Sequence, residues 1–132
     1  MRTNALKTNV LLIEDNEQNR YLVTFLLENQ GYRVTAAVDG PTGIAAATTQ
    51  HFDLILLDIQ LPVMDGYAVA RALRATPCKT PIVAVTSYAM TGDRENALAA
   101  GCNGYIEKPI NPATFVAEVS RFLRPSHEEQ QP

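Results

Sequence analysis

Five short segments with the composition of β-strands alternate along this chain with longer segments whose apolar residues recur at helical spacing. The expected strands are residues 10–13, about 32–36, 53–58, 82–87 and 104–107. Two of them, VLLI and DLILLD, contain four apolar residues in a row without alternation. This pattern is typical of strands that are covered on both faces.

The segments between these strands carry the start and stop signals of helices. Asn16 is a candidate N-cap for the first helix, and Gly31 follows its expected end. The second helix opens at DGP, the third follows LPVMDG, and the fourth is expected around 93–100. Asn111 and Pro112 start the last helix. The predicted core faces of the first, third and fifth helices are Leu22, Phe25 and Leu26; Val69, Ala70 and Leu73; and Phe115, Val119 and Phe122.

Five successive strand–helix units predict an α/β protein with a parallel five-stranded sheet between two layers of helices. The reason is that the crossovers between parallel strands are right-handed and must cover both faces. The 132 residues suffice for one such domain with a single core. We expect the domain at residues 8–124, an extension at 1–7 and a disordered tail at 125–132 that is too short for an output domain.

Polar residues gather where the expected strands end. In a parallel sheet of this kind, function lies at the carboxyl ends of the strands, near the switch in strand order. We therefore expect these side chains to converge at one edge of the sheet. They are Glu14 and Asp15 after the first strand, Asp58 at the end of the third, Thr86 and Ser87 at the end of the fourth, and Lys108 after the fifth.

Three carboxylates at one edge repel one another and raise each other's pKa, so a cation is expected beside them. Oxygen ligands of this kind suit Mg²⁺, for which Mn²⁺ can substitute. Lys108 adds a second positive group, and Thr86 adds a hydroxyl donor. With Asp58 as a carboxylate nucleophile, these are the groups needed to stabilise a phosphoryl group in transfer.

Each of these residues also has a structural explanation. An acidic pair stabilises the N-terminus of a helix, and an aspartate often caps a turn. A lone lysine is usually solvated, and a threonine suits a strand. The combination is informative because the expected fold selects these positions independently of the chemistry of their side chains.

Composition excludes several other classes of function. The formal net charge of -3 gives no basic surface for nucleic acid or an anionic membrane. No stretch has the pattern of a signal peptide or the length of a membrane span, so a cytoplasmic protein is expected. Cys78 and Cys102 lack metal-ligand spacing and are expected as separate thiols.

Four motifs, LLIEDN, DLILLDIQLPVMDG, VAVTSYA and YIEKPI, follow one another between about Val10 and Leu123. In this order and at these separations they resemble the receiver domain of response regulators, and the resemblance covers nearly the whole chain. It implies a flavodoxin-like (βα)5 three-layer sandwich with strand order 2-1-3-4-5.

The resemblance also implies roles for individual residues. Asp58 matches the phosphoacceptor. Glu14 and Asp15 match the acidic pair that holds magnesium, together with Asp58 and the backbone carbonyl of Gln60. Gln60 and Tyr88 match two positions that modulate the rate of phosphate loss.

Lys108 matches the lysine that contacts the phosphoryl group, and its bond to Pro109 is expected to be cis. Thr86 and Tyr105 match the hydroxyl and aromatic pair that rearranges on phosphorylation. The face made of the fourth helix, the fifth strand and the fifth helix is then expected to bind a downstream protein.

The implied function is that of a phosphorylation-activated response regulator in a two-component phosphorelay. A histidine kinase or a histidine phosphotransfer protein donates the phosphoryl group. The chain is not expected to be an enzyme, beyond assisting its own phosphorylation and dephosphorylation.

Three alternatives stay open. The chain could be a receiver-like interaction module that is never phosphorylated. It could also be a receiver cut from a hybrid histidine kinase, although the initiating methionine and the polar tail favour a free-standing protein. A magnesium-dependent phosphatase with an aspartyl phosphate would need an acid two residues after Asp58, where Gln60 stands.

Overall fold

The computed structural model describes residues 8–87 and 91–123, in which strands and helices alternate throughout. The strands are β1 (Asn9–Ile13), β2 (Arg33–Ala37), β3 (Leu54–Asp58), β4 (Ile82–Thr86) and β5 (Gly104–Glu107). The helices are α1 (Glu17–Glu28), α2 (Gly40–Thr49), α3 (Gly66–Arg74), α4 (Thr91–Ala99) and α5 (Phe115–Arg121). The expected extension at 1–7, the expected tail at 125–132 and Tyr88 lie outside the described residues.

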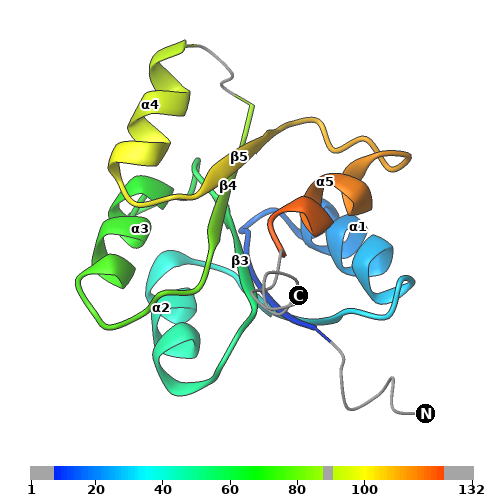
Figure 1. The fold of residues 1–132 in the computed structure, drawn as a ribbon, viewed down its shortest axis with the longest axis horizontal. Helices are drawn as coiled ribbons and strands as arrows, with labels where there is room; N and C mark the ends of the chain where they lie inside the picture. The colour runs from blue at the N-terminus through cyan, green and yellow to red at the C-terminus, as the bar shows by residue number, and fades with distance from the viewer. Residues whose placement is uncertain (1–7, 88–90, 124–132) are drawn as a thin grey trace, which may run out of the picture.

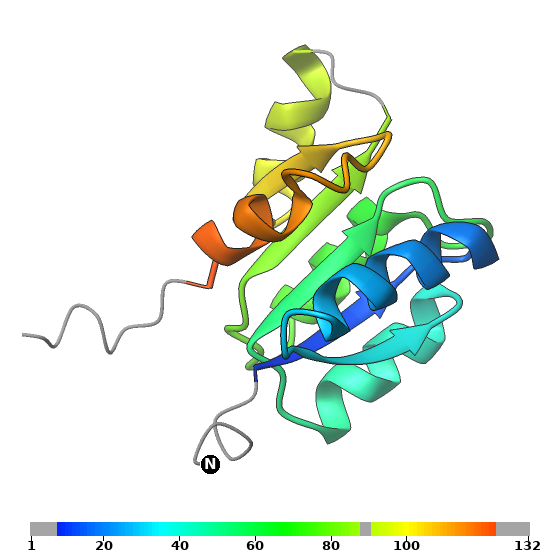
Figure 2. The same cartoon turned by 90° about the vertical axis from the view of Figure 1, so that its right-hand side faces the viewer.

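The strands form one parallel sheet in the order β2-β1-β3-β4-β5, which confirms the expected topology. Helices α1 and α5 cover one face of this sheet, and α2, α3 and α4 cover the other (Figure 1). Figure 2 shows the strands running side by side, with their carboxyl ends toward the same side of the molecule. The expected three-layer sandwich is therefore present.

The sheet separates two apolar cores because successive side chains of a strand point to opposite faces. Leu11 and Ile13 pack with residues of α3 and α4, whereas Val10 and Leu12 pack with residues of α1 and α5. All residues of β3 and β4 are buried. Polar groups at the carboxyl ends of these central strands therefore lie against an apolar interior.

Helix α1 corrects one part of the sequence prediction. Its N-cap is Asn16, as expected, and Gly31 adopts a φ of 94° after its end. The buried residues of the helix are Val23 and Leu27, however, whereas the predicted core residue Phe25 is 54% exposed. Leu22 and Leu26 are half-buried. Six of the seven residues from Tyr21 to Leu27 are apolar, so the sequence pattern alone does not define one face.

Helix α5 begins later than the sequence predicts. Asn111 was expected as its N-cap and Pro112 as its first residue, but the helix starts at Phe115. The reason is a tight turn, in which the backbone carbonyl of Asn111 accepts hydrogen bonds from the N–H groups of Thr114 and Phe115. The core face is placed as predicted for Phe115 and Val119, which are fully buried.

No helix in the described part of the chain is long and apolar enough to cross a membrane. Both cysteines are free thiols. Cys78 is half-buried and Cys102 is buried, and burial raises the pKa of the Cys102 thiol to about 11.

Val63, in the loop between β3 and α3, has a strained backbone. Its φ of 67° is the one positive value at a non-glycine residue in the described ranges. A β-branched side chain in this region crowds its own backbone. The side chain is fully exposed, at 101%, so burial does not offset the strain.

Replacing Val63 by Asn should raise the free energy of unfolding by about 1 kcal/mol, because asparagine tolerates the left-handed region. Equilibrium unfolding in urea measures this change. Val38→Asn is the matched control, since Val38 is also exposed and has no positive φ. An equal gain in both variants would show that strain at Val63 is not the cause.

Candidate functional site

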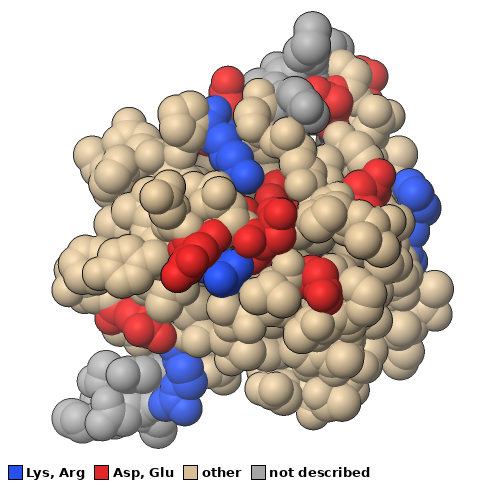
Figure 3. Space-filling view, turned by 180° about the vertical axis from the view of Figure 1, so that it is seen from behind, with Lys and Arg blue, Asp and Glu red and all other residues tan. Residues whose placement is uncertain are grey.

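Three carboxylates meet at the carboxyl ends of β1 and β3. One oxygen atom from each of Glu14, Asp15 and Asp58 lies within 4.8 Å of the other two. Figure 3 shows the face toward which the strands point, where acidic and basic side chains lie next to one another near the centre. In the described part of the chain, the buried polar or charged side chains are Glu14, Asp58 and Thr86, each 3% exposed. All three are residues that the sequence predicts at this edge.

Glu14 and Asp15 are held where β1 leads into α1. The N–H of Glu14 donates to the carbonyl of Ala37 at 3.0 Å, which continues the pairing of β1 with β2. Its side-chain Oε2 accepts from the N–H of Asn16 at 3.1 Å. The guanidinium of Arg20 donates to the backbone carbonyls of Glu14 and Asp15, at 3.1 and 3.0 Å. These bonds fix the main chain of the acidic pair.

Arg20 is a residue of this site that the sequence prediction missed. It lies in the first turns of α1, and its contacts are with backbone atoms five and six residues earlier. Its position shortly after the acidic pair is the signal that could have indicated it.

Asp58 is the last residue of β3, and two donors hold its Oδ1 atom. They are the N–H of Gln60 at 2.9 Å and the ammonium group of Lys108 at 3.2 Å. The first turn of α3 approaches this strand end closely. A Cβ atom on Gly66 would lie 2.6 Å from the backbone oxygen of Asp58, so only glycine allows this approach.

Lys108 lies directly after β5 and reaches across β4 toward β3. Its N–H donates to the carbonyl of Thr86 at 2.8 Å, and the bond between Lys108 and Pro109 is cis. Its Nζ atom lies 3.2 Å from Asp58 Oδ1 and 3.6 Å from Glu14 Oε1. One largely buried cation is therefore shared by two buried carboxylates.

Burial and a neighbouring charge perturb the Glu14 carboxyl group. The pKa of Glu14 is raised from 4.5 to about 7, first because burial disfavours its charge and second because Asp58 repels it. The hydrogen bond from Asn16 and the charge of Lys108 act in the opposite direction. Lys108 therefore does not fully compensate the negative charge at this site.

This donor set fits a hard divalent cation such as Mg²⁺. Three carboxylates supply oxygen atoms, and Asp15 is exposed, so the cluster is accessible from solvent. The negative charge left after pairing with Lys108 favours a further cation.

The hydroxyl-bearing residues of β4 lie beside this cluster. Thr86 is buried at the end of β4. It lies next to Asp58 because the residue before it, Val85, pairs with Asp58 on β3. Ser87 follows it and donates its hydroxyl to the side-chain oxygen of Gln60 at 2.8 Å. The sequence prediction for Tyr88 falls outside the described ranges.

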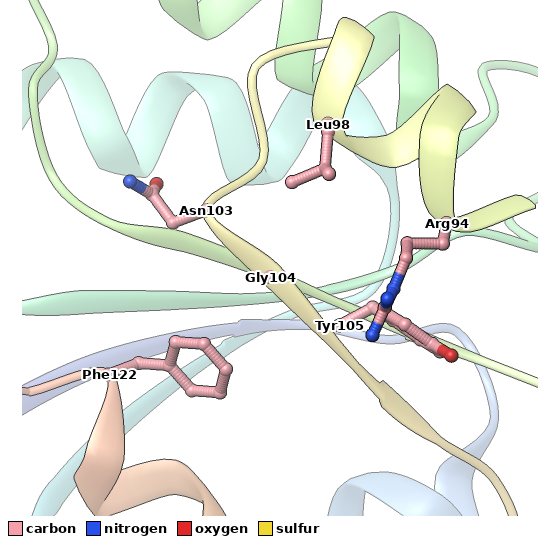
Figure 4. A pocket seen from close by; sticks show the side chains of 6 residues that line it. All are labelled: Arg94, Leu98, Asn103, Gly104, Tyr105 and Phe122. Atoms are coloured by element: carbon pink, nitrogen blue, oxygen red, sulfur yellow. The ribbon is translucent and has the colours of Figure 1, made fainter.

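Tyr105 is separate from the acidic cluster and lines a cavity of about 300 Å³ between α4, β5 and the end of α5. The guanidinium of Arg94 lies over its ring, 5.4 Å from the ring centre, and Figure 4 shows the two side chains alongside each other. The Phe122 ring packs so close to Gly104 that a Cβ atom there would lie 2.4 Å from it. The other lining residues are Leu98 and Asn103.

Replacing Glu14 by Gln removes a repelling charge and keeps an oxygen that can accept from Asn16. Because the folded-state pKa of Glu14 exceeds 4.5, the folded chain binds more protons than the unfolded chain between that pH and about 7. The free energy of unfolding therefore falls as pH rises through this window. In EDTA at about pH 8, Glu14→Gln should be more stable than the wild type by on the order of 2 kcal/mol.

Urea unfolding at about pH 8 and about pH 4.5 measures this gain, which should nearly vanish at the lower pH because Glu14 is then protonated when folded. Glu28→Gln, at the exposed end of α1, is the control. A gain that is independent of pH would contradict the assignment of the repulsion to Glu14.

Comparison with known proteins places this chain in a family. The sequence profile described as the response regulator receiver domain matches residues 10–120. The polar-differentiation response regulator DivK of Brucella ovis is 38% identical over 116 residues, which are 86% of this chain and 94% of that protein. A hybrid signal transduction histidine kinase of Dictyostelium discoideum is 38% identical over 91% of this chain, which spans only 4% of that kinase.

Solved structures show the same relationship. The receiver domain of a sensor histidine kinase from Pseudomonas aeruginosa, with a magnesium ion coordinated in its active-site cleft, has a TM-score of 0.81 and 40% identity, covering 89% of this chain and 98% of that one. A chemotaxis protein of Vibrio cholerae has a TM-score of 0.84 and 31% identity, covering 88% and 98%. The chain therefore belongs to the response regulator receiver domain family.

Proposed function

We propose that this chain is a phosphorylation-activated response regulator that accepts a phosphoryl group on Asp58 from a histidine kinase or a histidine phosphotransfer protein. The observation that carries the proposal is the environment of Asp58. Its carboxylate is buried, is bonded to Lys108 and to the N–H of Gln60, and lies beside two further acids. The family to which the chain belongs is one of signalling phosphoacceptors, so we propose that it is not an enzyme acting on a separate substrate.

The chain's own residues provide most of the chemistry. A carboxylate oxygen of Asp58 forms a bond to phosphorus while the bond between phosphorus and the donor's imidazole nitrogen breaks, and the electron pair leaves with the imidazole. The charge of Lys108, 3.2 Å from this carboxylate, offsets negative charge on the phosphoryl oxygens. The N–H of Gln60 holds the carboxylate in place before the reaction, so little reorganisation is needed.

A bound Mg²⁺ would supply positive charge and open positions for phosphoryl oxygens. We assign Glu14, Asp15, Asp58 and the backbone carbonyl of Gln60 as its ligands. The oxygen-only donor set and the closeness of the three carboxylates support this assignment, and Mn²⁺ would substitute because it prefers the same ligands.

We also propose that phosphorylation is read out through Thr86 and Tyr105. Thr86 ends β4 beside Asp58, and Tyr105 lies on β5, the next strand. The phosphoryl oxygens would attract the Thr86 hydroxyl and free a space for the Tyr105 ring. The cavity beside Tyr105 belongs to the face of α4, β5 and α5 that we assign to a downstream protein partner.

The same proposal covers the domain bounds, the cellular location and the binding partners of the chain. Residues 8–124 form the receiver unit, which the family match over residues 10–120 supports. The chain acts in the cytoplasm, in accord with its free thiols, and its charge of -3 argues against binding to nucleic acid or membrane. The similarity to a hybrid kinase leaves a second setting, as a receiver within a longer kinase, with the same chemistry at Asp58.

Incubation with acetyl phosphate and Mg²⁺ should add one phosphoryl group, detected as a gain in the mass of the intact protein. The gain should depend on Mg²⁺ and should be absent from Asp58→Asn, because the amide cannot act as the nucleophile. Asp53→Asn, at the opposite end of β3, is the control and should accept the group. No gain in the wild type would instead favour an interaction module that is never phosphorylated.

Phosphorylation should also change the surroundings of the Tyr105 ring, because the ring leaves its position beside Arg94. Nuclear magnetic resonance of the tyrosine ring signals measures this change, with Tyr105→Phe providing the assignment. Tyr21, which is 71% exposed on α1, serves as the internal reference. Unchanged Tyr105 signals in a fully phosphorylated sample would rule out its role as the switch.

A further inference from the structure

A hydrogen-bonded pair outside the acidic cluster joins the loops that follow β3 and β4. The side-chain oxygen of Gln60 accepts from the hydroxyl of Ser87 at 2.8 Å and from its N–H at 3.4 Å. Both residues are exposed, so the pair lies on the surface of the site. Sheet pairing already holds β3 and β4 together up to Asp58, so the fold does not require this additional bond.

The pair of Gln60 and Ser87 connects Asp58 with the end of β4. The N–H of Gln60 donates to Asp58 at 2.9 Å, while the Gln60 side chain reaches Ser87, the residue after Thr86. A phosphoryl group on Asp58 would attract Thr86 and would therefore lie between these two loops. The Gln60 carboxamide is exposed to solvent and is held next to the residue that precedes Ser87, Thr86.

We propose that Ser87 is a positioning residue that lengthens the life of the phosphorylated state by holding the Gln60 side chain across the path of water. The inference rests on the function proposed above. In hydrolysis, a water oxygen bonds to phosphorus while the bond from phosphorus to the Asp58 oxygen breaks. The electron pair returns to the carboxylate, and the water protons pass to phosphate and solvent. A side chain held in the water's path slows this reaction.

The expected effect of Ser87 on the rate of dephosphorylation has a specific size and depends on Gln60. A single hydrogen bond between exposed groups shifts an equilibrium by about three- to tenfold, so its loss should accelerate dephosphorylation by about that factor. Because Ser87 acts through Gln60, its contribution should disappear once the Gln60 side chain is removed. Two residues that act independently would instead give additive effects.

The test uses wild type, Ser87→Ala, Gln60→Ala and the double variant. Each is phosphorylated with acetyl phosphate and Mg²⁺, the donor is removed, and loss of the phosphoryl group is followed by intact mass. Ser87→Ala should lose it about three to ten times faster than the wild type, and the double variant no faster than Gln60→Ala. Ser87→Thr keeps the hydroxyl and should restore nearly the wild-type rate.

Ser120→Ala is the matched control, because it removes an exposed serine hydroxyl bonded to the carbonyl of Ala117 on α5. Urea unfolding verifies that all variants are folded. An unchanged or slower loss in Ser87→Ala, or an acceleration that persists in the Gln60→Ala background, would overturn the inference and leave the proposed function intact. A wild type that accepts no phosphoryl group would overturn both.

Discussion

The rest of the site depends on the burial of two like charges beside one another. Glu14 directly follows β1 and Asp58 ends the neighbouring strand β3. Each is 3% exposed, and the two share the ammonium group of Lys108. Burying carboxylates in this way costs stability unless cations and hydrogen bonds compensate. The arrangement is therefore incomplete without further positive charge, which explains why an apolar strand such as β1 runs directly into two acids. The raised pKa of Glu14 means that its charged form lowers the free energy of unfolding, a cost that is typical of functional sites.

In the function proposed above, the order of the strands would carry the signal away from Asp58. β4 lies between β3 and β5, so phosphorylation of Asp58 would affect Thr86 first and the strand that carries Tyr105 next. Lys108 spans the same three strands from the end of β5. Apolar side chains pack against both faces of the sheet, so we expect any rearrangement to involve side chains and loops rather than the strands. The proposed tie between Gln60 and Ser87 lies in these loops.

Much of this arrangement could be predicted from the sequence because the strands are nearly pure apolar runs and the functional residues stand at their ends. The convergence of Glu14, Asp15, Asp58 and Lys108 followed from the parallel fold alone. The strand order came from the resemblance to receiver domains. The buried face of α1 could not be predicted from the sequence, because apolar residues occur on more than one side of the helix. Tertiary packing alone selects Val23 over Phe25 for burial.

Several individual hydrogen bonds could also not be predicted from the sequence. The bonds from Arg20 to the carbonyls of Glu14 and Asp15 depend on how α1 leaves the strand. The bond between Gln60 and Ser87 depends on two loops that lie 27 residues apart. The start of α5 depends on a turn at Asn111 that a proline pattern does not distinguish from a helix. In the first two cases tertiary geometry, rather than local preference, decides.

The most direct test of the account is to identify the phosphorylated atom. Borohydride reduces an aspartyl phosphate to homoserine, so reduction after treatment with acetyl phosphate and Mg²⁺, followed by peptide sequencing in the mass spectrometer, locates the modified residue. The account predicts homoserine at position 58 and at no other position. Modification at another carboxylate, with Asp58 intact, would contradict it.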